Sequence, residues 1–208
     1  MRVCVLANEE QRAELSLKPC SEGTEIVFIE DVKQLNSGDS IDLYILLQEN
    51  IDYAKCFEIL EGKEVLVNSV IETLEDIHAP KNVHRINGWN SFLKRETWEI
   101  ASFGSQKLLK TLESMQWKCI QVKDEPGLIS ARVVSMIINE AYFAKEDNIS
   151  NKNDIDNAMK LGTNYPYGPF EWANIIGPDK IVGLLNRLFI SDERYQVSSC
   201  LLNELKNY

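Results

Sequence analysis

The sequence lacks the features that mark membrane-spanning, secreted or nucleic-acid-binding proteins. It has no stretch of about 18 apolar residues, and its start has no basic segment followed by an apolar one. Basic residues are in short supply, because 22 lysines and arginines stand against 32 aspartates and glutamates, for a net charge of −10. Since nucleic-acid phosphates need a basic surface, we expect neither a nucleic-acid nor a membrane partner. We expect a soluble, cytoplasmic protein.

Cysteine and histidine are too few and too scattered to suggest a metal centre or a disulfide framework. The only histidines are His78 and His84, which argues against a histidine-rich metal site. The cysteines are odd in number and include no Cys-x-x-Cys pair, a pattern typical of reduced thiols. They are Cys4, Cys20, Cys56, Cys119 and Cys200. We therefore predict no metal site.

The first half of the chain alternates short apolar runs with helix-like stretches. The runs cover residues 2–7, 25–29, 42–47 and 64–67. Apolar runs without polar alternation fit strands that are buried on both faces of a parallel sheet. Their alternation with helices is typical of an α/β domain. There is room for about four or five strands of the usual length, which predicts a shortened form of such a domain.

Glycine is missing from the turn where a dinucleotide-binding domain needs it most. In such a domain the first strand ends in G-x-G-x-x-G, which lets the backbone approach a pyrophosphate at a helix start. The equivalent turn here is Ala7-Asn8-Glu9-Glu10-Gln11, where side chains crowd a phosphate and two carboxylates repel it. Glu30 holds the place of a ribose-binding acid, but without the glycines it is better explained as a solvated strand end. We predict that NAD is not bound.

The pattern changes at Asp124-Glu125-Pro126, where apolar residues begin to recur with the 3.6-residue period of a helix. Pro126 and Gly127 are a helix-entry signal, and Gly162 is a helix end. Helices are expected over residues 129–144, 154–161, 181–189 and 198–205. The change predicts an α/β domain over residues 1–122 and a helical domain over residues 123–208.

The motifs of this second half resemble, in their order, the C-terminal domain of 3-hydroxyacyl-CoA dehydrogenases. They are Asp-x-Pro-Gly-(apolar)-Ile-x-x-Arg at 124–132, Asn-Glu-Ala at 139–141, Ile-Asp-x-Ala-Met-Lys-x-Gly at 155–162 and Pro-x-Gly-Pro-Phe at 166–170. The resemblance implies a shortened Rossmann-like parallel sheet, followed by an all-α domain like the C-terminal domain of 6-phosphogluconate dehydrogenase. It also implies an acyl-CoA ligand and a homodimer formed through the helical domain, by an apolar face that includes Val133, Ile137 and Phe143.

The resemblance nominates three site residues. Residues 83–89 resemble the family's His-Phe-Phe-Asn-Pro, whose His is the general base for the 3-hydroxyl group and is held by a downstream Glu. That His would be His84, and the Glu would be Glu96 in an ungapped comparison or Glu99 after a small insertion. Ser69 would be the hydroxyl contact, although capping of a helix over residues 71–77 explains it equally well.

One position in the second half departs from the family. The family has Asn where this chain has Ala131, whose methyl group donates no hydrogen bond. Such a loss typically costs about 10²–10³ in rate. Together with the missing glycines, it predicts a non-catalytic relative, a pseudoenzyme of acyl-CoA and fatty acid metabolism. The alternatives are an active NAD-dependent 3-hydroxyacyl-CoA dehydrogenase with His84 as base, and an unrelated helical adaptor.

Overall fold

The computed structural model describes residues 1–38 and 40–206, and the chain divides into two compact units. The first unit is Met1–Leu128 and the second is Ile129–Tyr208. The predicted boundary between residues 122 and 123 falls at the end of the last strand. The short segment that follows this strand, up to Leu128, belongs to the first unit.

The first unit is built on a seven-stranded sheet with the strand order β2-β1-β3-β4-β5-β6-β7. The strands are β1 (Arg2–Leu6), β2 (Glu25–Ile29), β3 (Leu43–Leu46), β4 (Val65–Asn68), β5 (Val83–Ile86), β6 (Thr97–Ala101) and β7 (Lys118–Val122). Neighbouring strands are parallel except for β5 and β6, which are antiparallel. The predicted Rossmann-like sheet is confirmed, but it has more strands than the four or five expected.

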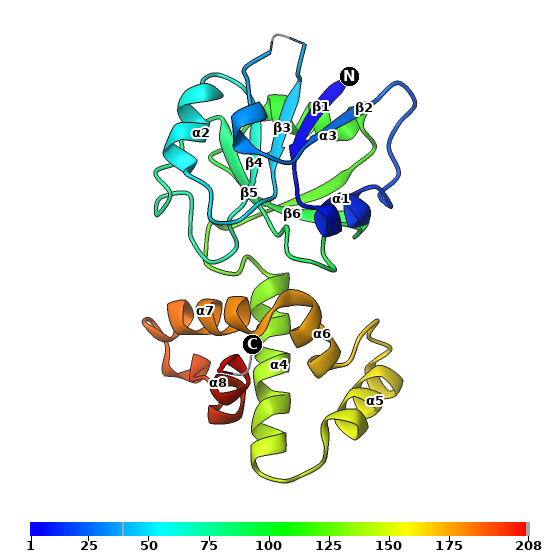
Figure 1. Ribbon diagram of the computed structural model, residues 1–208, viewed down its shortest axis with the longest axis vertical. Coiled ribbons are helices and arrows are strands. Elements are labelled where there is room, and N and C mark those ends of the chain that lie inside the picture. Colours follow the sequence, from blue (N-terminus) through cyan, green and yellow to red (C-terminus); the bar gives the residue numbers. More distant parts are fainter. Residues whose placement is uncertain (39, 207–208) are drawn as a thin grey trace. The chain divides into compact units, whose positions relative to one another are not determined.

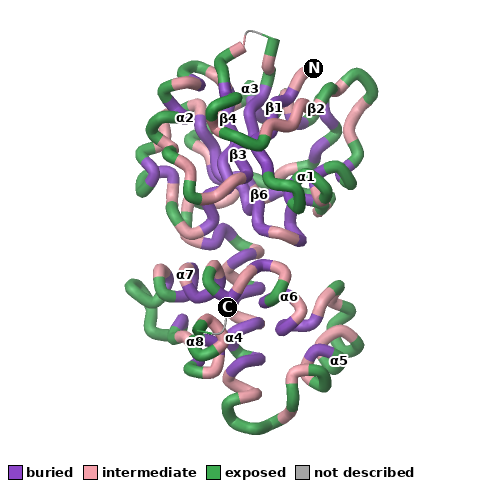
Figure 2. Tube along the Cα trace, in the orientation of Figure 1, coloured by how far each residue is buried: buried purple, intermediate pink, exposed green. Residues whose placement is uncertain are grey.

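Helices cover both faces of this sheet. They are α1 (Glu9–Leu15), α2 (Tyr53–Ile59), α3 (Gln106–Ser114) and a short 3-10 turn, η1 (Val32–Gln34). One buried cluster joins α1 and α3 to the sheet, and a second joins α2 to its other face. Strands β3 and β4 are buried along their whole length, as Figure 2 shows. This double burial explains why their sequences are uninterrupted apolar runs.

The helix considered for residues 71–77 is absent, and turns occupy these residues. The side chain of Asp76 accepts hydrogen bonds from both the backbone N–H and the hydroxyl of Thr73, at 2.9 and 2.8 Å. Side chains of this kind compete with the hydrogen bonds of a helix. Leu74 is nevertheless buried, so the segment packs onto the sheet as an ordered loop.

The second unit is entirely helical (Figure 1). Its elements are α4 (Ser130–Glu146), α5 (Lys152–Thr163), α6 (Pro169–Ile176), α7 (Pro178–Phe189), a 3-10 turn η2 (Glu193–Tyr195) and α8 (Ser199–Leu205). The long helix α4 packs against α6, α7 and α8, whereas α5 packs against α6 and is largely exposed (Figure 2). Among the described residues, no helix has both the length and the apolar character that a membrane crossing requires.

Asp156 of α5 holds the start of α6 in place. Its buried carboxylate accepts hydrogen bonds from the backbone N–H groups of Phe170 and Glu171, at 2.8 and 3.2 Å. Gly168 lies directly beside it, and a Cβ at that position would come within 2.3 Å of the Asp156 Cγ. Only glycine fits such a close approach. This contact is the physical reason for the spacing between the Ile-Asp and Pro-x-Gly-Pro-Phe motifs.

Candidate functional site

The topology of the first unit indicates where a ligand site would lie. In open α/β sheets, ligands bind beyond the carboxyl ends of the strands, at the point where the strand order reverses. The order here reverses between β1 and β3. The candidate site therefore consists of the turns that follow these strands and the neighbouring ends of β4 and β5.

The turn after β1 is closed by its own side chains. Asn8 caps α1, and its Oδ1 accepts a hydrogen bond from the Gln11 backbone N–H at 2.9 Å. The Gln11 Oε1 in turn accepts one from the Asn8 backbone N–H at 3.0 Å. A pyrophosphate at this place would bind the free N–H groups of the helix start. Two of the N–H groups of this turn are already engaged within the chain.

The side chain of Gln11 also spans the gap between β1 and β3. Its Nε2 donates a hydrogen bond to the Leu47 carbonyl at 2.7 Å, and the Asn68 Nδ2 donates to the same carbonyl at 3.0 Å. Both amide side chains are almost fully buried. The sequence analysis missed Gln11, although the spacing Asn8-x-x-Gln11 is a recognisable capping-box signal. The Gln11 side chain, with its hydrogen bond to Leu47, forms an amide bridge. This bridge occupies the space that a glycine-rich turn would leave open for a phosphate.

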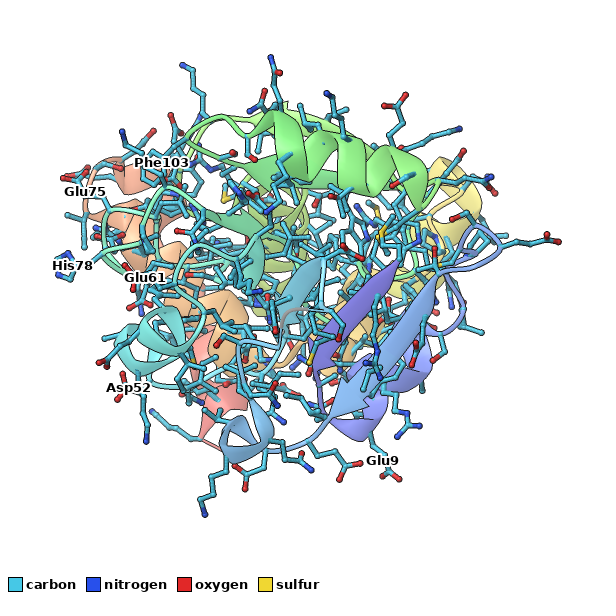
Figure 3. The ribbon with its side chains drawn as sticks, turned by 90° about the horizontal axis from the view of Figure 1, so that it is seen from above. Glu9, Asp52, Glu61, Glu75, His78 and Phe103 are labelled. Carbon is cyan, nitrogen blue, oxygen red and sulfur yellow. The ribbon has the colours of Figure 1, made fainter. Side chains whose placement is uncertain are left out.

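The acidic residues around this turn are exposed. Glu9 lies at the rim of the molecule and points away from it (Figure 3). Glu10 is exposed too, and its Oε2 accepts a hydrogen bond from the Asn90 Nδ2 at 2.8 Å. Glu30 follows β2 as an exposed strand end, and its carbonyl accepts a hydrogen bond from the Gln48 side chain at 2.8 Å. These carboxylates add negative charge near the turn, while the amide bridge closes it.

His84 is completely buried. It lies near the amino end of β5, whereas the candidate site lies at the carboxyl ends of the strands. Its Nε2 is 3.1 Å from Oε2 of Glu64, a residue just before the amino end of β4. Its Nδ1 is 2.8 Å from Oγ of Ser102, which follows β6. Because β4 and β5 are parallel, both partners lie at the amino ends of these strands. This placement argues against His84 as a base for a ligand at the carboxyl ends.

The predicted pairing of His84 with Glu96 or Glu99 is therefore wrong. Glu96 is exposed and forms an ion pair with Lys118. The register of β5 and β6 explains the error, because Ile86 pairs with Ile100. Continued by one residue, this register would place Glu99 opposite Asn87, three positions beyond His84.

Burial lowers the pKa of His84 below its usual value, and the hydrogen bond to Glu64 only partly offsets this effect. A histidine that is harder to protonate in the folded state stabilises the fold fully above its unfolded pKa. That contribution is lost progressively as the pH falls below about 6.5.

We expect the imidazole signals of His84 in an NMR titration to shift at a pH below 6.5. The chain has one other histidine, the exposed His78, so the two sets of signals can be assigned with a His78→Gln variant. Signals of His84 that titrate above pH 7 would contradict the buried, neutral state.

Asn87 takes the place that the sequence analysis gave to His84. It follows β5 directly at the carboxyl edge, and the neighbouring Gly88 N–H donates a hydrogen bond to the Asn68 Oδ1 at 3.0 Å. The separation of His84 and Glu96 (96 − 84 = 12) equals that of Asn87 and Glu99 (99 − 87 = 12). The spacing of twelve residues therefore does not distinguish the two pairs. A neutral amide cannot accept a proton from an alcohol at neutral pH.

Two hydroxyl groups flank Asn68 at this edge. Ser69 lies at the carboxyl end of β4 as predicted, and its Oγ donates a hydrogen bond to the Glu72 carbonyl at 2.9 Å. The Tyr53 hydroxyl donates to the Asn68 carbonyl at 3.1 Å. Burial, with nearby Glu72, raises the pKa of Tyr53 to about 12. Tyr53 is therefore a protonated donor at neutral pH and no substitute for a general base.

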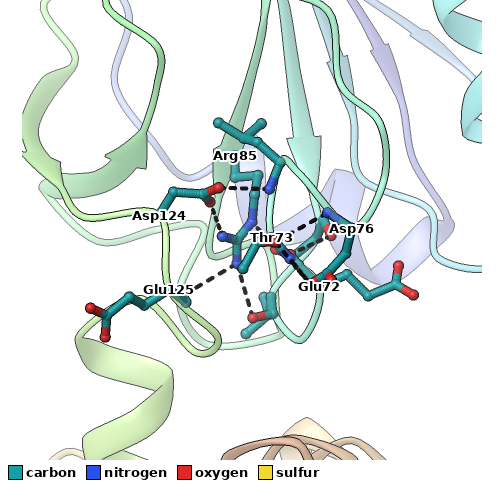
Figure 4. Close-up of polar contacts among 9 residues, drawn as sticks. Glu72, Thr73, Asp76, Arg85, Asp124 and Glu125 are labelled. Atoms are coloured by element: carbon teal, nitrogen blue, oxygen red, sulfur yellow. Dashed lines mark hydrogen bonds and ion pairs between the residues drawn. The ribbon is translucent and has the colours of Figure 1, made fainter.

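A buried arginine ties the carboxyl end of β5 to two loops (Figure 4). The Arg85 Nε donates to the Ser69 carbonyl at 2.7 Å, and its Nη2 donates to the Val70 carbonyl at 3.2 Å. Its Nη1 forms an ion pair with Asp124, whose second oxygen accepts the Leu74 N–H at 2.8 Å. The arrangement is saturated by the chain itself, so Arg85 is a structural anchor.

Comparison with known proteins gives a family for the second half. The family profile "3-hydroxyacyl-CoA dehydrogenase, C-terminal domain" matches residues 127–206. Over 99 residues the chain is 39% identical to 3-hydroxyadipyl-CoA dehydrogenase of Escherichia coli (strain K12), covering 47% of this chain and 21% of that protein. Over 78 residues it is 36% identical to 3-hydroxybutyryl-CoA dehydrogenase of Clostridioides difficile, covering 36% and 28%. The chain thus spans well under half the length of these relatives.

Solved structures with the same fold cover both halves of the chain. FadB2 of M. tuberculosis matches with a TM-score of 0.76 and 14% identity, over 99% of this chain and 93% of that chain. (S)-3-hydroxybutyryl-CoA dehydrogenase PaaH1 of Ralstonia eutropha matches with a TM-score of 0.71 and 17% identity, over the same shares. At these identities the likeness shows the fold alone. The family profile thus assigns residues 127–206, the helical part of the chain, to the C-terminal domain of the 3-hydroxyacyl-CoA dehydrogenase family.

Proposed function

We propose that this protein is a non-catalytic member of its family, which binds an acyl-CoA thioester but neither binds NAD nor oxidises a 3-hydroxyacyl group. The observation that carries the proposal is the closed turn after β1. Gln11 bridges to Leu47 where a pyrophosphate would lie, and its capping box with Asn8 engages two backbone N–H groups. A nucleotide would have to break these hydrogen bonds, of which the one from Gln11 to Leu47 is buried, and an unpaired buried amide is costly.

Two substitutions in the places of proton-handling groups support the loss of chemistry. Asn87 stands where the register of β5 and β6 favours the family's general base. Ala131, which is fully buried in the first turn of α4, stands where the family has a hydrogen-bonding Asn. Each change removes a different part of the reaction, one the proton acceptor and the other a polar contact to the substrate oxygen.

An acyl-CoA ligand is supported by the features that the helical half shares with its relatives. The relatives named above act on 3-hydroxyadipyl-CoA and 3-hydroxybutyryl-CoA by name, and the family profile matches the helical half of this chain. The contact of Asp156 with α6 joins two of the motifs that resemble the family. We therefore assign the thioester-binding part of the function to this chain and leave the redox part out.

The second candidate function is the active dehydrogenase with His84 as base. It would need a His within reach of a substrate at the carboxyl edge, but both ring nitrogens of His84 are engaged at the amino edge. Continuing the register of β5 and β6 by one residue would place Glu99 opposite Asn87 and not opposite His84. An active enzyme would therefore have to use a different base.

Isothermal titration calorimetry with NADH and with acetoacetyl-CoA, run side by side, tests the proposal. We expect saturable heat with acetoacetyl-CoA and none with NADH. Binding of both ligands would restore the enzyme hypothesis. Binding of neither would remove the acyl-CoA part of the proposal and favour a role as an adaptor for another protein.

We also propose that the protein is a homodimer formed through its helical unit. Val133 of α4 is 51% exposed, Ile149 is 72% exposed and Leu161 of α5 is 88% exposed. Ile137 and Phe143, which the sequence analysis placed on the same apolar face, are partly exposed. Uncovered apolar side chains of this kind mark interaction surfaces when they are contiguous.

An obligate dimer contact buries about 2,000 Å² or more, so the dimer should persist at micromolar concentration. Light scattering should then give the mass of two chains. A Val133→Glu variant should shift the mass toward one chain. Leu17→Glu is the matched control, since Leu17 is 71% exposed but lies in the first unit. A monomer mass for the unmodified protein would end this proposal.

A further inference from the structure

A serine, a histidine and a carboxylate are joined in series at the amino ends of β4 and β5, away from the candidate site. The Ser102 Oγ lies 2.8 Å from Nδ1 of His84, and Nε2 of the same ring lies 3.1 Å from Oε2 of Glu64. Ser102 follows β6, His84 belongs to β5 and Glu64 precedes β4. This order of groups is the one that activates a serine nucleophile, and it is recognised by geometry and not by sequence position.

Glu64 fixes the orientation and the tautomer of the His84 ring. Its Oε2 accepts a hydrogen bond from the Ser105 hydroxyl at 3.0 Å as well as the one from His84, and its Oε1 lies 4.0 Å from the Lys107 Nζ. A carboxylate accepts hydrogen bonds and donates none, so the neutral ring carries its proton on Nε2. Nδ1 is therefore the acceptor that faces the Ser102 hydroxyl, in the position of a general base.

The turn after β6 leaves the Ser102 hydroxyl accessible. Ser102 is half-buried, whereas His84 is completely buried. Gly104 has a φ of 98°, and a Cβ added to it would meet no other atom within 4 Å. Its backbone N–H donates a hydrogen bond to the Ser102 Oγ at 2.9 Å, which stabilises negative charge as the hydroxyl loses its proton. Phe103, the next residue after Ser102, is 56% exposed and offers apolar surface for a short acyl chain.

We propose that Ser102, His84 and Glu64 form a hydrolytic site that cleaves small esters of short-chain carboxylic acids. Ser102 is the nucleophile, His84 is the general base, and Glu64 is the positioning residue. The site uses neither NAD nor acyl-CoA, and it lies at the amino ends of the strands. The proposal is therefore independent of the proposed function, which concerns the carboxyl ends and the helical unit.

The reaction balances without an oxidant, a metal or a cofactor. The Ser102 Oγ bonds to the ester carbonyl carbon while its proton passes to Nδ1 of His84. The bond from this carbon to the alcohol oxygen then breaks, and the alcohol leaves with the proton from Nδ1. Water repeats the two steps on the acyl-serine, which releases the acid and restores the serine hydroxyl. The sum is ester plus water giving acid plus alcohol.

A fluorophosphonate probe tests the nucleophile in the unmodified protein. The serine oxygen bonds to phosphorus and fluoride leaves with the serine proton, so mass spectrometry should find one adduct per chain, on Ser102. The labelling rate should fall at least about 100-fold in Ser102→Ala. Ser114→Ala is the matched control, because Ser114 is exposed and its hydroxyl donates only to the Thr111 carbonyl among its described contacts, at 2.8 Å. Hydrolysis of p-nitrophenyl acetate should follow the same pattern.

A Glu64→Gln variant separates positioning from a merely structural role, since it keeps an acceptor but removes the charge. The charged groups that face the ring are Glu64 and, behind it, Lys107 of α3. The labelling rate of the unmodified protein should rise with pH to a plateau, with a midpoint below pH 6.5, because burial lowers the pKa of His84. Glu64 raises that pKa, so the midpoint should fall further in the variant. The plateau rate should drop at least about tenfold.

Four outcomes would overturn the proposal. They are no adduct on Ser102, equal labelling of the Ser102→Ala variant, a folded Glu64→Gln variant with unchanged rate and midpoint, and an adduct on Ser102 without turnover of p-nitrophenyl acetate. Circular dichroism shows whether each variant is folded. If Glu64→Gln does not fold, the comparison of Ser102→Ala with Ser114→Ala still decides the question.

Discussion

Replacing Arg85 by methionine should lower the free energy of unfolding of the first unit by about 2–4 kcal/mol. The Arg85 side chain is completely buried, and its guanidinium binds two backbone carbonyls as well as Asp124. The substitution would leave the Asp124 carboxylate without its cation and the carbonyls of Ser69 and Val70 without these donors. An Arg85→Lys variant should recover little of this stability, because a single ammonium group cannot match the planar, forked set of donors of the guanidinium.

Urea unfolding followed by circular dichroism measures this effect. The control is Arg12→Met, because Arg12 is exposed and lies over the Phe28 ring at 5.1 Å. A change of less than about 1 kcal/mol is expected there. If Arg85→Met were as mild as the control, Arg85 would not be a structural anchor, and a ligand-binding role for it would have to be considered.

Replacing Asp156 by alanine should lower the stability of the helical unit by about 2–4 kcal/mol. The buried carboxylate accepts the N–H groups of Phe170 and Glu171, and both groups would lose their partner. The substitution also removes the side chain that packs against Gly168. The start of α6 should therefore fray, which hydrogen exchange at these two amides would report.

The matched control is Asp154→Ala, two positions earlier on α5. Asp154 is exposed. Among the contacts between side chains described for it, its carboxylate accepts one hydrogen bond, from the Asn151 Nδ2 at 2.7 Å. We expect an effect of less than about 1 kcal/mol. Equal effects of the two substitutions would mean that α5 as a helix, and not the cap on α6, is what the family motif preserves.

The fold was largely predictable from the sequence, because its signals are local. The 3.6-residue period predicted α4, and the apolar runs predicted β1 to β4, since burial on both faces leaves no polar positions in a strand. The end of α5 was placed at Gly162, but the left-handed cap is Asn164, with φ of 57°. Asparagine is among the few residues other than glycine that adopt this conformation. Strands β5 and β6 were underestimated because neither is a long apolar run.

The site was less predictable, because it depends on which residue stands at the end of a strand. A shift of three residues separates His84 at the amino edge from Asn87 at the carboxyl edge. The sequence alone favoured His84, because the residue at this place in the family motif is a histidine. Only the pairing of β5 with β4 and β6 decides where the strand ends. Gln11 was not predicted for a related reason, because its hydrogen bond to Leu47 joins residues 36 positions apart in the sequence.

The most direct test of the account is a fluorescence titration of NADH against the unmodified protein. We expect no saturable change up to high micromolar concentrations, because Gln11 and Asn8 close the turn and Glu9 and Glu10 carry negative charge near it. Saturable binding in the low micromolar range would contradict the central claim that this chain has lost its nucleotide site.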